Sequence, residues 1–459
     1  RQLKKRQRGQ AVRLEFEVGT SRFMRRFMTQ EMNLEKEDMY QIDGPLDMTV
    51  FFGFCGIKGY NHLRYPEAHP HSPWSMLELK RTPETNIFDM IREKDLLIHL
   101  PYESFDESVV NFLYSAANDK DVLAIKQTLY RVSSSSPVVQ ALEKAVQNGK
   151  QVTVLMEVKA RFDEANNILM ARRLEKAGAH VIYGLVGLKT HSKCTLVIRR
   201  EKDGIRRYVH VATGNYNAST AKLYTDLGIL TCNDRFGIDA SAFFNLLSGY
   251  SDPPIWDSFI VAPINLRQRC IELIDREIHF AKNGEDAHMI AKMNSLLDKG
   301  IIEKLYEASQ AGVKIELIVR GICVLIPGIP GISDNITVRS IVGRFLEHSR
   351  IFWFRNGGRE ELYISSADWM PRNLNDRVEL MVPIEDPEIK RRLKQMVDIE
   401  LSDNQKAHIM QADGTWLKTI SAENQLCAQE YFQKIAEKRD AEDEMTLAQK
   451  LEPYTPVLG

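Results

Sequence analysis

The sequence repeats one order of segments in two halves, and this repeat restricts the fold more than any other feature. In the first half, a helical pattern ends at Gly149, the strand pattern VTVLMEV follows, and a later strand opens with H-S-K at His191. In the second half, a helical pattern ends at Gly312, the strand pattern KIELIVR follows, and a later strand opens with H-S-R at His348. Strands that alternate with helices are typical of a mostly parallel sheet covered by helices. The repeat therefore predicts an α/β fold of two similar domains in tandem, each with a mostly parallel mixed sheet.

Signals that start and stop individual segments agree with this alternation. Ser136 is a helix-capping residue type, Pro137 suits the first helical position, and Gly149 suits the end of the helix. After each histidine motif, two strand patterns flank a short turn sequence, EKDGI in the first half and NGG in the second, which predicts a hairpin in each half. The apolar stretch GICVLIPGIPGI is interrupted by glycine and proline, so we expect a loop there.

The 459 residues divide into four predicted regions. These are residues 1–77, with a strand over 11–18, a helix over 21–32 and a proline-rich linker; residues 78–258, with the first histidine motif; residues 259–405, with the second; and a partly helical tail, 406–459. Because the chain begins inside the basic run RQLKKRQRG, we expect that a longer protein continues on the N-terminal side.

Composition and charge exclude several classes of partner and site. Lys and Arg together number 61 and Asp and Glu 62, so the net charge is −1 and gives no sign of a nucleic-acid or membrane partner. Any anion must therefore bind at a local cluster of basic residues. The six cysteines are scattered without a C-x-x-C pair, which is typical of a reducing compartment and not of a zinc site or disulfide framework. No apolar run is long enough to span a bilayer, and we expect a cytoplasmic protein.

The histidine motifs have the residue types of a site that acts on an anionic group. Residues i and i+2 of a strand point to the same face, so His191 and Lys193 project together. An imidazole exchanges its proton near neutral pH, and a lysine adds a compact positive charge. A single H-x-K motif is more often a solvated strand end than an active site. Here, however, a second motif with the same spacing, H-S-R, begins at His348. The duplication predicts that both histidines face one another across a pseudo-twofold axis and form one site.

Longer segments resemble a known family. H-x-K followed by GNYN resembles the half-site of the phospholipase D superfamily, which places paired motifs in one active site. KQTLYR, ATGNYNASTAKLYTDLG and LYISSADWMPRNL resemble, more closely, polyphosphate kinases of the bacterial histidine-phosphorylating type. This resemblance covers roughly residues 80–405, and residues 1–75 resemble the end of that family's head domain. The family's N-terminal domain and most of its head domain are expected to be missing from this chain.

The resemblance implies reversible transfer of the terminal phosphate of ATP to inorganic polyphosphate, with Mg²⁺ as cofactor. It implies that His191 is phosphorylated, that His348 lies at the nucleotide site, and that Tyr224 and Arg320 contact ATP. We expect His348 to be catalytic as well, by protonating the departing oxygen or by stabilising the phosphohistidine. Homo-oligomers are typical of the family. No nucleic-acid partner is implied, and peripheral membrane association stays open.

Further residues are expected to bind phosphate groups. They are Lys193, Arg350, Asn215 and Asn217, together with Arg131 and Arg161, which the resemblance places in the magnesium–phosphate region. Arginine has no lone pair for a cation, so its approach to the metal would run through phosphate or water. Ser366 and Asp368 end strands that face the same cleft, and we expect Asp368 to orient a histidine.

Two other functions compete with the kinase. A phosphodiesterase of the phospholipase D type would use the same phosphohistidine, but Arg350 stands where such an enzyme usually has lysine. A non-catalytic relic of the scaffold would bind polyanions without turnover. The chain has no G-x-x-x-x-G-K-[ST] motif, which argues against a P-loop kinase.

Overall fold

The structure is a computed structural model that describes residues 10–77, 85–133, 135–159, 164–249 and 255–450, without the side chains of 440–450. The chain forms two compact units, Arg1–Ala68 and His69–Gly459. In the first unit, β1 (Leu14–Glu17) pairs in parallel with β2 (Met39–Ile42), and α2 (Arg22–Met32) connects the two strands. The Ser21 hydroxyl caps α2 by accepting a hydrogen bond from the backbone of Met24 at 3.1 Å. The predicted strand and helix of this region are confirmed.

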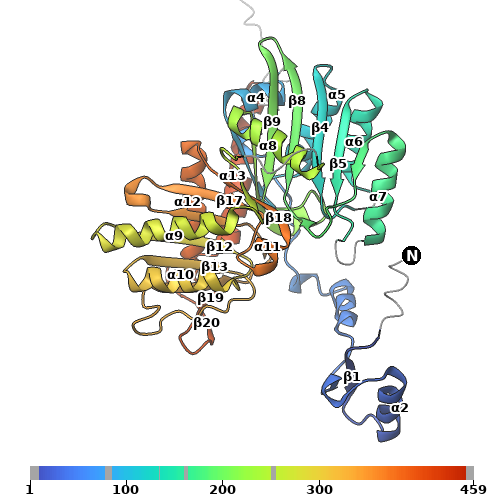
Figure 1. Cartoon of the computed structure of the whole chain (residues 1–459), viewed down its shortest axis with the longest axis vertical. Helices are drawn as coiled ribbons and strands as arrows, with labels where there is room; N and C mark the ends of the chain where they lie inside the picture. The colour runs from blue at the N-terminus through green and yellow to red at the C-terminus, as the bar shows by residue number, and fades with distance from the viewer. Residues whose placement is uncertain (1–9, 78–84, 134, 160–163, 250–254, 451–459) are drawn as a thin grey trace, which may run out of the picture. The chain divides into compact units, whose positions relative to one another are not determined.

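The second unit contains two mixed sheets with helices, as the repeat predicts (Figure 1). The strands of the first sheet run in the order β15-β10-β9-β8-β4-β5-β6, and β3 also pairs with β10. Their bounds are β3 (Leu96–Leu100), β4 (Val122–Leu129), β5 (Gln151–Met156), β6 (His180–Ile182), β8 (Cys194–Glu201), β9 (Gly204–Ala212), β10 (Tyr224–Thr231) and β15 (Leu346–Glu347). The helices of this half are α4 (Ile87–Glu93), α5 (Asn111–Asn118), α6 (Pro137–Gln147), α7 (Glu164–Ala177) and α8 (Asp234–Leu247).

The second sheet repeats this plan and extends it. Its strand order is β11-β18-β17-β16-β12-β13-β14-β19-β20, and β7 also pairs with β18. The bounds are β7 (Lys189–Thr190), β11 (Ile260–Ala262), β12 (His288–Met293), β13 (Lys314–Val319), β14 (Ile336–Ile341), β16 (Ile351–Phe354), β17 (Glu361–Ser365), β18 (Arg377–Pro383), β19 (Ala407–Met410) and β20 (Trp416–Lys418). The helices of this half are α9 (Leu266–Lys282), α10 (Lys299–Gln310), α11 (Pro371–Asn375), α12 (Pro387–Leu401) and α13 (Ala428–Lys450).

Local signals explain why the segments begin and end where they do. Helix α6 starts at Pro137 after a cap by Ser136, whose hydroxyl accepts from the backbone of Val139 at 3.4 Å, and Gly149 follows its end with φ +78°. The predicted hairpins are β8–β9 and β16–β17. The stretch at 321–332 is a loop, as expected.

The sheets are less parallel than predicted. Strands β4, β5 and β6 pair in parallel, as do β12, β13 and β14, but each hairpin adds antiparallel partners on one side of this core. Antiparallel pairs consequently outnumber parallel pairs among the described strands. In the sequence, the alternation of strands and helices predicts only the parallel strands at the centre of each sheet. The strands of a hairpin are antiparallel and have no helix between them, so they do not contribute to this pattern.

Two very short strands cross from one half to the other. Strand β7, directly before His191, pairs in parallel with β18 of the second half, with Thr190 opposite Val378. Strand β15, directly before His348, pairs in parallel with β10 of the first half, with Thr225 opposite Glu347. Each histidine motif is therefore anchored on the sheet that carries the other one. The boundaries expected at residues 77, 258 and 405 stay predictions.

An apolar core in the second half buries a stacked aromatic pair. The ring centres of Phe352 and Trp369 lie 4.9 Å apart, and the ring planes are nearly parallel, at 7°. Helices α9 and α10 lie side by side over this core (Figure 1). Among the described helices, none has both the length and the apolar character that crossing a membrane requires.

Replacing Trp369 should destabilise the second half strongly. Trp369→Ala removes a fully buried indole and its stacking contact with Phe352, so the free energy of unfolding should fall by about 3–5 kcal/mol. Urea unfolding followed by circular dichroism measures this loss. Trp416→Ala is the matched control, because its side chain is 37% exposed, and its cost should stay below about 1 kcal/mol. Equal losses in both variants would contradict the packing described.

Candidate active site

His191 is held by a carboxylate from the other half of the unit. It precedes β8, and its Nδ1 lies 2.9 Å from both carboxylate oxygens of Glu379 on β18. Glu379 also accepts hydrogen bonds from the Ser366 hydroxyl at 2.5 Å and from the side-chain amide of Asn373 at 2.6 Å. These hydrogen bonds hold the Glu379 carboxylate in place, and the carboxylate in turn holds the imidazole of His191.

His348 shows the same arrangement with the halves exchanged. Its Nδ1 lies 2.9 Å from both carboxylate oxygens of Asp226 on β10, in the first half. The Thr213 hydroxyl donates to Asp226 at 2.6 Å. A Cβ at Gly214 would collide with the Asp226 side chain, so this position requires glycine. The G-N-Y-N sequence that follows the first hairpin thus makes room for the acid that orients the second histidine.

These contacts fix the reactive nitrogen of each ring. When Nδ1–H donates to a carboxylate, the neutral imidazole keeps its lone pair on Nε2. A carboxylate that accepts from Nδ1–H also raises the basicity of Nε2 and fixes the orientation of the ring plane. Nε2 of His191 is therefore prepared to act as a nucleophile.

Burial keeps both imidazoles neutral. Burial lowers the pKa of His191 well below the ordinary value of 6.5, and the positive charges of Lys193, Arg377 and Arg350 add to this effect, as does His348. The two rings are thus near enough for protonation of one to disfavour protonation of the other, which agrees with a shared site. For His348, burial lowers the pKa and Arg350 assists, whereas Asp226 opposes the shift without reversing it.

The two carboxylates respond differently to burial. Burial raises the pKa of Glu379 even though Lys193 and Ser366 favour its charged form. Burial acts in the same sense on Asp226, but contacts with His348 and Thr213 outweigh it and lower the pKa of Asp226.

The third residue of each motif is a buried cation. Lys193 donates through Nζ to the carbonyl of His191, and burial lowers the pKa of Lys193 to about 7 although Glu379 opposes this shift. Arg350 donates through Nη1 to the carbonyl of His348 at 2.7 Å. Its Nε and Nη2 donate to the two oxygens of Asp368 at 3.1 and 3.2 Å.

This ion pair corrects one expectation. Asp368 was expected to orient a histidine, but among its described partners are Arg350 and Asn294, whose backbone donates to it at 2.8 Å. The acids that orient the histidines are Glu379 and Asp226. Ser366 does face the site, as expected, through its hydrogen bond to Glu379.

An aromatic ring flanks each imidazole. The ring of Tyr130, at the end of β4, lies 4.8 Å from that of His191, and the ring of Tyr224, at the start of β10, lies 5.1 Å from that of His348. Tyr224 is thus beside the histidine with which it was expected to bind nucleotide. Tyr130, which also comes from the first half, has the corresponding place beside His191.

Three arginines were also expected at the site. Arg320 directly follows β13 and donates to the carbonyl of Glu347 at 3.2 Å and to Asn294, so its guanidinium lies next to the His348 segment. Arg131 follows β4, with its guanidinium 5.8 Å from the centre of the Tyr130 ring. Arg161 lies outside the described residues.

The two asparagines of the G-N-Y-N sequence have different surroundings. Asn217 is a turn residue: its Oδ1 accepts from the backbones of Ser219 and Thr220 at 3.0 and 3.1 Å. Asn215 lies between Gly214 and the buried Tyr216, next to the strand of Asp226, and lines a small cavity together with that carboxylate.

Four residues of the site were missed from sequence: Glu379, Asp226, Arg377 and Tyr130. A signal was available for the two acids. Each is the only charged residue among the apolar positions of its strand interior, in TDLGIL and VELMV. Acids are almost never fully buried unless they are paired, so an acid in a strand of this kind indicates a partner, although not which one.

The described residues do not form a cage for a metal ion. Within the described ranges, no group of three or more His, Cys, Asp and Glu side chains is arranged to hold one. The acids of the site are engaged with His191, His348 and Arg350.

Comparisons with known proteins cover most of the chain. The family model for the polyphosphate kinase middle domain matches residues 1–54, that for C-terminal domain 1 matches 86–253, and that for C-terminal domain 2 matches 259–429. A polyphosphate kinase of Halalkalibacterium halodurans is 54% identical over 410 residues, which are 89% of this chain and 57% of that protein. One of Thermosynechococcus vestitus is 49% identical over 435 residues, 90% of this chain and 59% of that protein.

A solved structure agrees in fold. The crystal structure of polyphosphate kinase from Porphyromonas gingivalis matches with a TM-score of 0.84 at 34% identity, over 94% of this chain and 65% of that one. The present chain thus spans less than two thirds of the length of each of these relatives.

Just below pH 6.5 both site histidines should be less protonated than ordinary histidines, because burial lowers the pKa of each ring. The unfolded chain binds protons there that the folded chain does not, so the free energy of unfolding should fall as the pH drops below 6.5. Titration of histidine ring signals by NMR measures the midpoints, with His191→Gln and His348→Gln to assign them.

The same protein in urea is the control, since its histidines should titrate near 6.5. Midpoints at or above that value in the folded protein, for either ring, would contradict the buried and neutral state.

Proposed function

Because this chain belongs to the polyphosphate kinase family, we propose that it carries that family's phosphotransfer site. The proposed reaction is reversible transfer of the γ-phosphate of ATP to inorganic polyphosphate through a phosphohistidine on His191. One observation carries the proposal: two buried, neutral imidazoles, each bound at Nδ1 by a carboxylate, lie among the cations Lys193, Arg350 and Arg377.

In the first step, Nε2 of His191 attacks the γ-phosphorus in line with the bond to ADP. The P–N bond forms as the P–O bond to ADP breaks, and ADP leaves as an anion. The imidazole gains positive charge, and the Nδ1–H···Glu379 contact stabilises it. In the second step, a terminal oxygen of polyphosphate attacks the phosphorus, the P–N bond breaks, and His191 returns to its neutral form.

The cations stabilise the transferred group. Negative charge spreads over its three equatorial oxygens, and Lys193, Arg350 and Arg377 can act on them. Arginine binds two phosphate oxygens through its planar fork. Each well-placed donor supplies about 3–4 kcal/mol of transition-state stabilisation, by analogy with donors in oxyanion holes. An anionic ligand beside Lys193 would also favour the charged form of this lysine.

We assign His348 to binding and not to acid catalysis. Its lowered pKa keeps it neutral, and a phosphate leaving group with a second pKa of about 6 needs no proton at neutral pH. His348, Tyr224 and Arg320 would hold the nucleotide, with the Tyr224 ring as a platform for adenine.

The nucleotide is proposed to arrive as its Mg²⁺ complex. The ion would offset phosphate charge, and the chain's own contribution would be to hold the phosphates through Arg131, Arg161 and Asn215. Asn217 would support this loop. Homo-oligomerisation and peripheral association with a membrane are further proposals from the family resemblance. A cytoplasmic location is a further proposal from the scattered cysteines.

Labelling by ATP tests the proposed role of His191. With γ-³²P-ATP the protein should acquire acid-labile, base-stable label, and His191→Ala should abolish it. Glu379→Gln should slow labelling at least on the order of a hundredfold, because the ring loses the carboxylate that fixes its tautomer. His348→Ala should weaken nucleotide use and transfer to polyphosphate.

His279→Ala, on the exposed face of α9, is the matched control and should label like the wild type. Undiminished labelling of His191→Ala would reject the assignment. Label from α-³²P-ATP, or ester cleavage without nucleotide, would instead support the phosphodiesterase. Polyphosphate binding without any label would support a non-catalytic relic.

A further inference from the structure

A buried carboxylate precedes the second histidine and joins three parts of the chain. Glu347 is 3% exposed and directly precedes His348. Its Oε2 accepts from the Thr225 hydroxyl at 2.8 Å and from Lys292 Nζ at 2.6 Å, and its Oε1 accepts from the Gln429 side-chain amide at 2.6 Å. These partners lie on β10, β12 and α13.

The contact with Thr225 reaches the histidine itself. The Thr225 hydroxyl donates to Glu347 and accepts from the backbone N–H of His348 at 3.2 Å. Thr225 directly precedes Asp226, the acid that holds His348. Glu347 therefore ties together the two strand ends that carry this histidine and its carboxylate.

Gln429, in the first turn of α13, uses both ends of its side chain on the same segment. Its Oε1 accepts from the backbone of Phe345 at 2.9 Å, and its Nε2 donates to the carbonyl of Phe345 at 2.9 Å as well as to Glu347. A Cβ at Gly343 would collide with the Gln429 amide. Only a side chain with both a donor and an acceptor makes this set of bonds.

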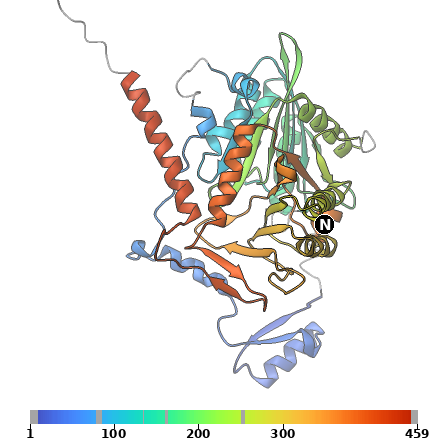
Figure 2. The same cartoon turned by 90° about the vertical axis from the view of Figure 1, so that its left-hand side faces the viewer.

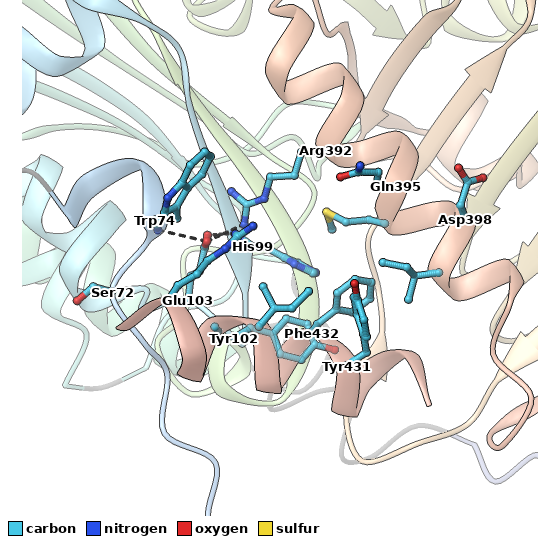
Figure 3. Close-up of a pocket in the computed structure, with 15 residues that line it drawn as sticks. Ser72, Trp74, His99, Tyr102, Glu103, Arg392, Gln395, Asp398, Tyr431 and Phe432 are labelled. Carbon is cyan, nitrogen blue, oxygen red and sulfur yellow. Dashed lines mark hydrogen bonds and ion pairs between the residues drawn. The ribbon is translucent and has the colours of Figure 1, made fainter. Parts of the chain in front are cut away.

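The start of α13 is firmly docked, which makes it a fixed support for Gln429. Figure 2 shows α13 as the long C-terminal helix, near α12. Phe432 of α13 packs against His99 and Tyr102, with ring centres 5.1 and 5.5 Å apart, and Tyr102 in turn contacts Phe345 at 5.6 Å. Figure 3 shows His99, Tyr102 and Phe432 beside a cavity of about 370 Å³ between α12 and α13. Neither histidine of the site lines that cavity.

The cluster around Glu347 is costly to bury. Lys292 bridges Glu347 and Glu400 of α12, and all three side chains are at least 96% buried. Apolar residues of similar volume would often stabilise a core equally well. A buried ionic cluster beside His348 is therefore better explained by its holding the neighbouring residues in a defined position than by a gain in the free energy of unfolding.

We propose that Glu347 and Gln429 are positioning residues for His348, so that the first turn of α13 belongs to the framework of the active site. The role in catalysis rests on the proposed function of His348. Their role in holding the His348 ring in place does not depend on that function, and the experiment measures the two roles separately.

Gln429→Met tests the proposal, because it keeps length and volume but removes both hydrogen-bonding groups. We expect kcat for phosphate transfer to fall on the order of tenfold, the factor that corresponds to one lost buried hydrogen bond to a charged group. The ring signal of His348, observed by NMR in histidine-labelled protein, should shift, and that of His191 should stay in place. Gln433→Met, one turn further along α13, should change neither quantity.

An unmoved His348 signal in Gln429→Met would overturn the proposal whatever the activity, and so would equal effects in both variants. Should Gln429→Met fail to fold, Gln429→Glu keeps the shape and the acceptor but sets a carboxylate against Glu347, and the same shift is expected. If the wild type shows no kinase activity, the proposed function fails, and the NMR measurement alone decides the positioning role.

Discussion

The site depends on an exchange of strand ends between two similar halves. Strand β7 leaves the first half to pair with β18, and β15 leaves the second half to pair with β10. Each exchange brings a histidine of one half against a carboxylate of the other, His191 against Glu379 and His348 against Asp226. Neither half holds a complete site, because each lacks the acid that orients its own imidazole.

Burial then determines the chemistry. It keeps the imidazoles neutral at physiological pH, which a nitrogen nucleophile requires, and it strengthens every charge interaction in the pocket. The same burial makes an unpaired charge expensive, and Arg350 is accordingly held by Asp368.

Features that are encoded in a short stretch of sequence could be predicted, whereas contacts that depend on how distant strands pair could not. The repeat, the helix ends at Ser136 and Gly149, and the paired motifs at His191 and His348 are written in short stretches of sequence. The acid of His191 lies 188 positions away and that of His348 lies 122 positions away. These pairings follow from crossing strands of two residues each, too short for any periodic pattern to reveal. For the same reason Asp368 was assigned to a histidine when its described ion pair is with Arg350.

The most direct test of this account is to determine which ring nitrogen of His191 carries the phosphate in the trapped phosphoenzyme. Coupling between ³¹P and ¹⁵N in protein with labelled histidine distinguishes the two positions. Because Glu379 occupies Nδ1, the account predicts phosphorylation at Nε2. Phosphate on Nδ1 would contradict it, since the carboxylate from the second half could not then be holding that nitrogen.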